Sequence, residues 1–89
     1  MVRVVFTPNL QRHIACPPAE VAARTVREAL DAAFAGNDRA RAYVLDDQAG
    51  LRKHMAVFVN GARIQDRVHL SDSVPDGSEI YVLQSLSGG

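Results

Sequence analysis

One stretch of the chain has the apolar spacing of an amphipathic helix, and the sequence on either side alternates with the period of strands. Apolar side chains recur three and four residues apart and so share one helix face: Val26, Ala29, Leu30, Ala33 and Phe34. Thr25 and Glu28 match a capping box at the start, and Gly36-Asn37 tolerates the left-handed conformation that ends helices. We therefore predict one main helix that packs its apolar stripe on a sheet.

The N-terminal residues have the period-two pattern of a strand, in which successive side chains point to opposite faces. We predict a strand over residues 2–7, closed by the turn chemistry of Pro8-Asn9. A second, weaker strand is expected over residues 12–16, where it would return as a hairpin. Pro17-Pro18 would end that strand, because two prolines remove two backbone donors.

Two further alternating segments lie in the second half of the chain. The first is predicted around Met55, Val57 and Val59, and Asn60-Gly61 favours a tight hairpin turn that returns over residues 62–65. Residues 75–78 form a strong turn signal before the last strand, residues 79–84. Alternation in that strand places one pair of side chains on each face: Ile80 and Val82 on one, Tyr81 and Leu83 on the other.

The segments between these elements have weaker signals. Residues 43–45 fit a short strand, residues 46–50 a turn or exposed loop, and residues 70–74 a turn or short helical piece. With 89 residues, 47% of them hydrophobic, the chain is long enough for one core and too short for two. We expect one domain over residues 1–84 and a flexible C-terminal tail, residues 85–89.

The charge balance excludes several classes of partner. Ten acidic and ten basic residues leave no net charge, so no general field draws the protein to nucleic acid or to an anionic membrane. No apolar run is long enough to span a bilayer, and no charged segment followed by an apolar stretch opens the sequence. Cys16 is the only cysteine and cannot form an internal disulfide. We expect a cytoplasmic protein whose partners recognise a local surface.

Three motifs in the C-terminal third carry a resemblance to a known family. They are Val57-Phe58-Val59-Asn60-Gly61, Asp76-Gly77-Ser78-Glu79-Ile80 at the last strand, and Ser87-Gly88-Gly89 at the end. With these motifs and this order of elements, the chain resembles the bacterial ubiquitin-like sulfur carriers, which include the molybdopterin synthase small subunit and the thiamine-pathway sulfur carrier. The resemblance implies an α+β, β-grasp fold: a mixed sheet of four to five strands packed on one main helix, with a C-terminal Gly-Gly tail.

The resemblance also implies a protein cosubstrate without catalytic residues of its own, or the small subunit of a synthase. In the family, an E1-like adenylating enzyme joins the terminal carboxylate to AMP, and sulfur then displaces AMP to leave a thiocarboxylate. By resemblance this role belongs to Gly89. ATP and the sulfur donor would be used through the partner enzyme, with no cofactor or metal bound to the carrier. Gly88 and Gly89 provide a slim leader, since glycine has no Cβ to collide with the walls of a partner's site, and Ser87 precedes them in the tail.

The sequence leaves the pathway and the acceptor open. Members of the molybdopterin branch often carry Pro-Pro where this chain has Gln84-Ser85, and residues 46–53 look longer than in the shortest carriers. The acceptor would be a molybdopterin synthase large subunit, a cysteine-synthase-like enzyme or a thiamine-pathway enzyme. A ubiquitin-like modifier that forms isopeptide bonds through Gly89 would need the same tail. A β-grasp interaction module without tail chemistry is a third alternative.

Alternation predicts an apolar patch on the sheet face that looks away from the helix. Phe58 falls out of phase with the helix-facing residues of its strand, and Tyr81 and Leu83 would join it if the last strand lies alongside. We predict that this patch, with Leu86 of the tail, docks the activating enzyme. The alternative is that residues 38–53 fold over this face and bury it. Arg63 and Arg67 nearby would add charge or simply remain solvated.

Other candidate sites have weak support in the sequence. The three histidines, His13, His54 and His69, have no carboxylate or cysteine at metal-ligand spacing. Cys16 has no neighbouring histidine and is expected at a partly buried strand end, without special reactivity. The isolated turn glycines lack the lysine and the strand-to-helix context of a phosphate-binding loop.

Overall fold

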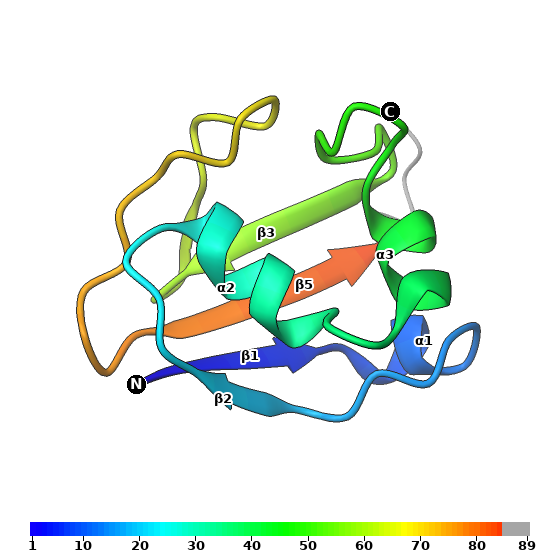
Figure 1. Ribbon diagram of the computed structural model, residues 1–89, viewed down its shortest axis with the longest axis horizontal. Coiled ribbons are helices and arrows are strands. Elements are labelled where there is room, and N and C mark those ends of the chain that lie inside the picture. The colour runs from blue at the N-terminus through cyan, green and yellow to red at the C-terminus, as the bar shows by residue number, and fades with distance from the viewer. Residues whose placement is uncertain (85–89) are drawn as a thin grey trace.

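The last strand of the chain lies in the middle of its sheet (Figure 1). The computed structural model describes residues 1–84. Its elements, in chain order, are β1 (Val2–Phe6), α1 (Pro8–Gln11), β2 (Ala19–Val21), α2 (Val26–Ala33), α3 (Asp38–Val44), β3 (Met55–Val59), β4 (Ala62–Arg63) and β5 (Glu79–Gln84). The strands follow the order β2-β1-β5-β3-β4, so β5 is flanked on both sides.

The sheet is mixed, because β5 runs parallel to β1 and antiparallel to β3. Val4 is opposite Ile80 in the first pair, and Val57 is opposite Val82 in the second. These four side chains are fully buried and face the helices. The inward faces predicted for Val57 of β3 and for Ile80 and Val82 of β5 are therefore confirmed.

The predicted main helix is α2, and its start has the capping contacts that the sequence indicates. The side chain of Thr25 accepts a hydrogen bond from the backbone N–H of Glu28 at 3.2 Å. Glu28 accepts in return from the backbone N–H of Arg24 at 2.8 Å, one residue before the cap. Gly36, with φ of 76°, follows the helix in the left-handed region as predicted.

The N-terminal hairpin was predicted in the wrong place. Residues 12–16 form no strand; the chain makes the short helix α1 at Pro8, and β2 pairs with β1 only after Pro17-Pro18. Proline at the first position of a helix leaves no missing hydrogen bond, so Pro8 starts a helical turn where we expected only a turn. Since β2 is an edge strand, the two prolines can precede it without disrupting the ladder.

A second correction concerns residues 43–45, which belong to the end of a helix and not to a strand. Asn37 caps α3 by accepting from the backbone N–H of Ala40 at 3.2 Å, so the residue expected to end one helix begins the next. Ala40 and Val44, four residues apart, are fully buried. Leu45 makes only an isolated bridge to Leu51.

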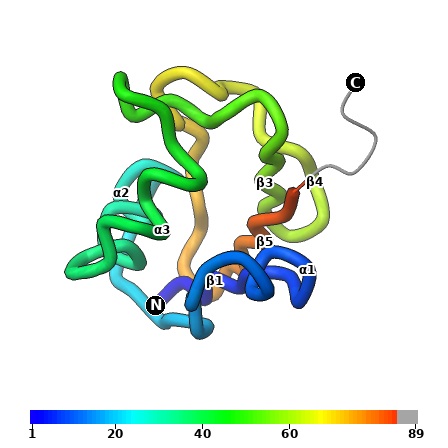
Figure 2. Tube along the Cα trace, turned by 90° about the vertical axis from the view of Figure 1, so that its right-hand side faces the viewer, coloured from blue at the N-terminus to red at the C-terminus, as the bar shows by residue number. Residues whose placement is uncertain are grey.

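Both longer helices lie on the same face of the sheet, as Figures 1 and 2 show from two directions. Leu30 and Phe34 from the α2 region and Val44 from α3 join one core with the inward side chains of the strands. The segment with α3 therefore covers the helix side, and the alternative in which it covers the opposite face is wrong.

The turns that flank β3 and β5 were predicted correctly. Asn60 and Gly61 have φ values of 50° and 87° and join β3 to β4, which is only two residues long. Gly77 has φ of 83° in the turn before β5, where the N–H of Ser78 donates to the carbonyl of Pro75 at 3.1 Å. Residues 70–74 form neither a helix nor a strand of the sheet, and Ser73 makes only an isolated bridge to Thr25. No helix within residues 1–84 has the length and apolar character that crossing a membrane requires.

Candidate functional site

The sheet face opposite the helices carries the predicted apolar patch. Phe58 of β3 is opposite Tyr81 of β5, and Ala56 is opposite Leu83. Tyr81 is 40% exposed, Phe58 and Leu83 are half-buried, and Ala56 is buried. We call the surface of Phe58, Tyr81 and Leu83 the outer patch. The register thus brings together three of the four residues that the sequence proposed for partner docking.

Charged side chains border the outer patch on two sides. The guanidinium carbon of Arg63, which is opposite Phe58 in β4, lies 5.5 Å from the centroid of the Phe58 ring. On the other side Arg3 pairs with Glu79 at 3.8 Å. A hydrogen bond to the Glu79 carboxylate, and the charge of that carboxylate, raise the pKa of Tyr81. The Tyr81 hydroxyl therefore remains a neutral donor on this surface.

Arg67 does not border the outer patch with Arg63. Its guanidinium donates to the backbone carbonyl of Arg52 at 2.9 Å, in the loop that precedes β3. Arg67 lines a separate groove, together with Arg27 of α2. The grouping of Arg63 with Arg67 failed because the two residues are close only in sequence.

The end of β5 is bonded by Tyr43 of α3, and His13 in the turn after α1 packs on Tyr43, a feature that the sequence analysis missed. The Tyr43 hydroxyl donates to the side-chain carbonyl of Gln84 at 3.2 Å. The His13 ring stacks on Tyr43, with centroids 5.9 Å apart and planes at 14°. No sequence signal links these positions, since residues 43 and 84 meet only through the fold. The bond fixes the last described residue of β5.

The predicted reacting residue and its leader lie outside the described residues. The sequence continues after Gln84, the end of β5, with Ser85 and then the four predicted tail residues: Leu86, Ser87, Gly88 and Gly89. Their roles stay predictions.

The other candidate residues form no metal-binding group within residues 1–84. No group of three histidine, cysteine or acidic side chains in this range is placed to hold a metal ion. Cys16 is buried in the segment between α1 and β2, and not at a strand end as predicted. Burial raises the pKa of the Cys16 thiol, so little thiolate forms at neutral pH.

These elements build the β-grasp fold, which the sequence predicted. The chain matches a chain of the Amycolatopsis orientalis BexX/CysO complex with a TM-score of 0.80, 23% identity and full coverage of both chains. It matches SAMP1 from Haloferax volcanii with a TM-score of 0.75 and 24% identity, over 99% of this chain and 98% of that one. CysO from Mycobacterium tuberculosis matches with a TM-score of 0.77 and 16% identity, over 97% and 100%.

The likeness to these proteins is one of fold. No protein-family model matches the sequence, and no curated protein matches it significantly. Another match, from Methanosarcina acetivorans, is named small archaeal modifier protein 1. The fold therefore occurs in a chain of the BexX/CysO complex and in proteins named as modifiers, and the function of this chain has to be argued from its own surfaces.

Proposed function

We propose that this protein is a sulfur carrier whose Gly89 carboxylate is adenylated by a partner enzyme and converted to a thiocarboxylate. The observation that carries the proposal is a β-grasp sheet whose central strand, β5, leads directly into a sequence that ends in Gly88-Gly89. The fold shared with CysO and SAMP1 supports the same assignment.

The proposed reaction needs no catalytic side chain from the carrier. A carboxylate oxygen of Gly89 attacks the α-phosphate of ATP held by the partner, pyrophosphate leaves, and an acyl-adenylate remains. A sulfur nucleophile from the donor then attacks the acyl carbon, and AMP leaves with the C–O bond electrons. With a persulfide donor, the outer sulfur forms the bond to the acyl carbon. A thiol then attacks the donor's inner sulfur, so that the S–S bond breaks, a donor disulfide forms, and the outer sulfur remains on Gly89 as a thiocarboxylate. The carrier supplies the carboxylate, a slim leader at Gly88 and a docking surface.

Deleting Gly89 is the direct test of the carrier proposal. The full chain is incubated with ATP, its cognate adenylating enzyme and a sulfur donor, and intact-mass spectrometry follows a single exchange of oxygen for sulfur. The exchange is expected in the full chain and absent after the deletion. Mass spectrometry of protein from its own cells also establishes the mature C-terminus. A chain that is never activated, although its mature C-terminus is Gly89, contradicts the proposal.

The outer patch is the surface that we propose docks the adenylating enzyme and orients the tail. Phe58→Asp should raise KM for the carrier in the adenylation assay, because a charge replaces a ring at the centre of the apolar surface. Ala32→Asp is the matched control, since Ala32 is exposed on α2 at the other side of the sheet. Both variants must give the circular dichroism spectrum of the parent. An unchanged KM for folded Phe58→Asp contradicts this docking role.

A protein modifier is the second candidate, and the fold shared with small archaeal modifier protein 1 favours it. It uses the same adenylate, but a lysine amine and not sulfur attacks the acyl carbon. Heavier conjugates in cells, lost on deletion of Gly89, would identify this route. A thiocarboxylate without conjugates would identify the carrier route, with a synthase of the molybdopterin, cysteine or thiamine type as acceptor. We place both routes in the cytoplasm, where ATP is available.

A further inference from the structure

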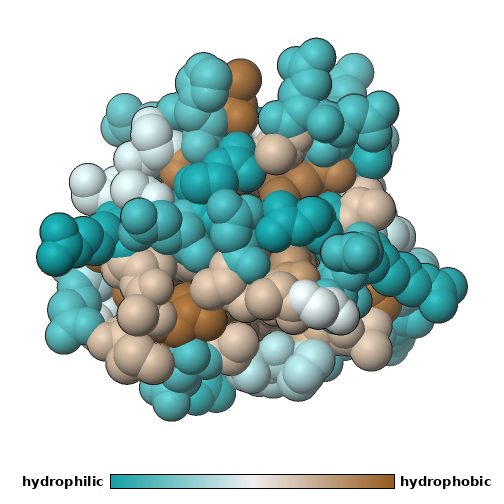
Figure 3. Space-filling model, viewed as in Figure 1, coloured by the Kyte–Doolittle hydropathy of each residue, from teal (hydrophilic) through white to brown (hydrophobic). Residues whose placement is uncertain are grey.

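A groove of about 580 Å³ lies between two loops on the helix side of the molecule, away from the outer patch. One loop contains residues 46–51 and the other residues 66–69. In the space-filling view they project as separate lobes with a hollow between them (Figure 3). Its lining includes Arg27, Asp46, Gly50, Arg67, Val68 and His69.

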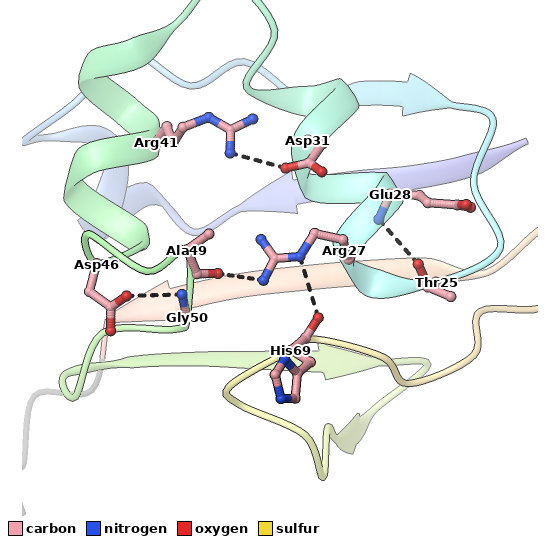
Figure 4. Close-up of polar contacts among 9 residues, drawn as sticks. All are labelled: Thr25, Arg27, Glu28, Asp31, Arg41, Asp46, Ala49, Gly50 and His69. Atoms are coloured by element: carbon pink, nitrogen blue, oxygen red, sulfur yellow. Dashed lines mark hydrogen bonds and ion pairs between the residues drawn. The ribbon is translucent and has the colours of Figure 1, made fainter.

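Arg27 joins the two loops to α2, as Figure 4 shows. Its Nη2 donates to the carbonyl of Ala49 at 2.6 Å and its Nε to the carbonyl of His69 at 3.3 Å. The loops also contact each other directly, because the N–H of Leu51 donates to the carbonyl of Arg67 at 2.8 Å. The groove is therefore a built feature whose walls are fixed by hydrogen bonds.

An apolar side chain stands out from the wall of this groove. Val68 is 64% exposed, the most exposed valine, leucine, isoleucine or aromatic residue within residues 1–84. Its backbone is nevertheless fixed, because Asp66 accepts hydrogen bonds from the N–H groups of Val68 at 3.1 Å and His69 at 2.9 Å. The fold thus holds a hydrophobic side chain in water, which removes the entropic cost of ordering this loop on binding.

The charges around Val68 favour an acidic occupant. Arg27 and Arg67 are both half-buried in the groove. The Asp46 carboxylate, which opposes them, already accepts from the N–H groups of Gln48 at 2.9 Å and Gly50 at 3.0 Å. The chain as a whole has no net charge, so this concentration of cations is local. The second carboxylate beside Val68, that of Asp66, is likewise already engaged, because it accepts from the N–H groups of Val68 and His69 and from the Ser71 hydroxyl. Two arginines beside these two acids do not make the extended basic surface that nucleic acids need.

We propose that this groove is a second docking site, and that it binds an acidic segment of a partner protein through Arg27, Arg67 and Val68. Carboxylates of the segment would pair with the guanidinium groups, and an apolar side chain would pack on Val68. The site is separate from the outer patch, so its occupant leaves Phe58 and Tyr81 free. The inference does not depend on the chemistry proposed for Gly89.

The test uses the full ¹⁵N-labelled chain and a short peptide of alternating glutamate and leucine. Titration followed by NMR should shift the amides of residues 46–51 and 66–69, and added salt should weaken the binding. The same peptide with glutamine for glutamate should bind about tenfold more weakly or worse, since the charge pairing is lost. Shifts confined to the outer patch, or equal binding of both peptides, overturn the proposal.

Val68→Glu is the informative variant. The Val68 side chain is exposed, and the hydrogen bond from residue 68 to Asp66 comes from the backbone N–H, so the substitution should not disturb the loop. It should weaken peptide binding about tenfold or more by placing a like charge in the groove. Ala32→Glu adds the same charge at an exposed position of α2 outside the groove lining, so it is the matched control and should leave peptide binding unchanged. A titration with inorganic phosphate at the same concentration distinguishes a protein segment that carries carboxylates from a small free anion. If phosphate gives the same shifts and competes equally, the groove binds small anions and the proposed protein partner is wrong.

Discussion

At the scale of single residues, Asp66 determines the shape of the loop that carries Val68. Its carboxylate accepts from the Ser71 hydroxyl and from the N–H groups of His69 and Val68. These bonds, that of the Ser71 hydroxyl first, lower the pKa of Asp66 from 3.8 to about 2. The folded state therefore favours the ionised form of this carboxylate.

Asp66→Ala should destabilise the fold at neutral pH by an amount that disappears in acid. Because the folded pKa is lower than the unfolded one, the stabilisation is complete above 3.8 and is lost as pH falls to about 2. Urea unfolding of parent and variant at neutral pH, and again near pH 2, checks this. Asp47→Ala, at another exposed carboxylate, is the control. If the parent and Asp66→Ala differ by the same free energy of unfolding at neutral pH and near pH 2, the role of ionised Asp66 is contradicted.

Cys16 should react slowly with alkylating reagents while the protein is folded. The side chain is 3% exposed, and burial raises the pKa of its thiol, so both access and thiolate are limited. Mass spectrometry after iodoacetamide treatment should show little labelling in buffer and complete labelling in urea. Rapid labelling of folded protein would show that the segment between α1 and β2 opens frequently.

At the scale of elements, Thr25 is the residue with which to test the start of α2. Thr25→Ala removes the acceptor for the N–H of Glu28 and should lower the free energy of unfolding by about 0.5–2 kcal/mol. Thr25→Ser keeps the hydroxyl and should recover most of the loss. Urea denaturation of the three proteins measures both effects. Equal loss in both variants would assign the effect to the missing methyl group and not to the cap.

The elements that could be predicted from the sequence are those whose signals are local. The stripe and capping residues of α2 identified a helix, and Asn60-Gly61 identified a hairpin, because spacing and backbone conformation act over a few residues. Alternation also gave the outward phase of Phe58, Tyr81 and Leu83. The outer patch therefore followed from the sequence once β3 and β5 were assumed to be neighbours.

The elements that could not be predicted depend on distant partners. α3 has two buried positions, Ala40 and Val44, and too few residues for a stripe to be distinguished from a short strand. β2 has three residues and exists because β1 is available to pair with it. The groove and the Tyr43–Gln84 contact are brought together by tertiary structure alone. Gly88 and Gly89 were identified by their sequence, and their roles stay predictions.

At the scale of the whole molecule, the two surfaces lie on opposite sides of the sheet. The outer patch is formed by β3 and β5, and the groove by loops next to α2. One partner on each side would not collide with the other. A partner in the groove would thus leave the outer patch exposed for the adenylating enzyme that we propose docks there.

Removing β5 should abolish folding, whereas removing only the residues after it should not. β5 supplies the buried side chains Ile80 and Val82 and joins β1 to β3. A chain of residues 1–78 is expected to give a disordered NMR spectrum, and a chain of residues 1–84 a dispersed one. A folded 1–78 chain would show that the sheet can close without its central strand. An unfolded 1–84 chain would show that the domain needs the residues beyond Gln84.

The central position of β5 has a consequence for synthesis on the ribosome. Arg3 pairs with Glu79, so the first strand must wait for almost the whole chain to be translated before its parallel neighbour emerges. Contacts so distant in sequence slow folding, and the unpaired edges of β1 and β3 remain open to aggregation in the meantime. Because Gly88-Gly89 follows β5 by only a few residues, a nascent chain that stops before β5 is complete lacks both the central strand of the sheet and the residue whose carboxylate we propose is activated.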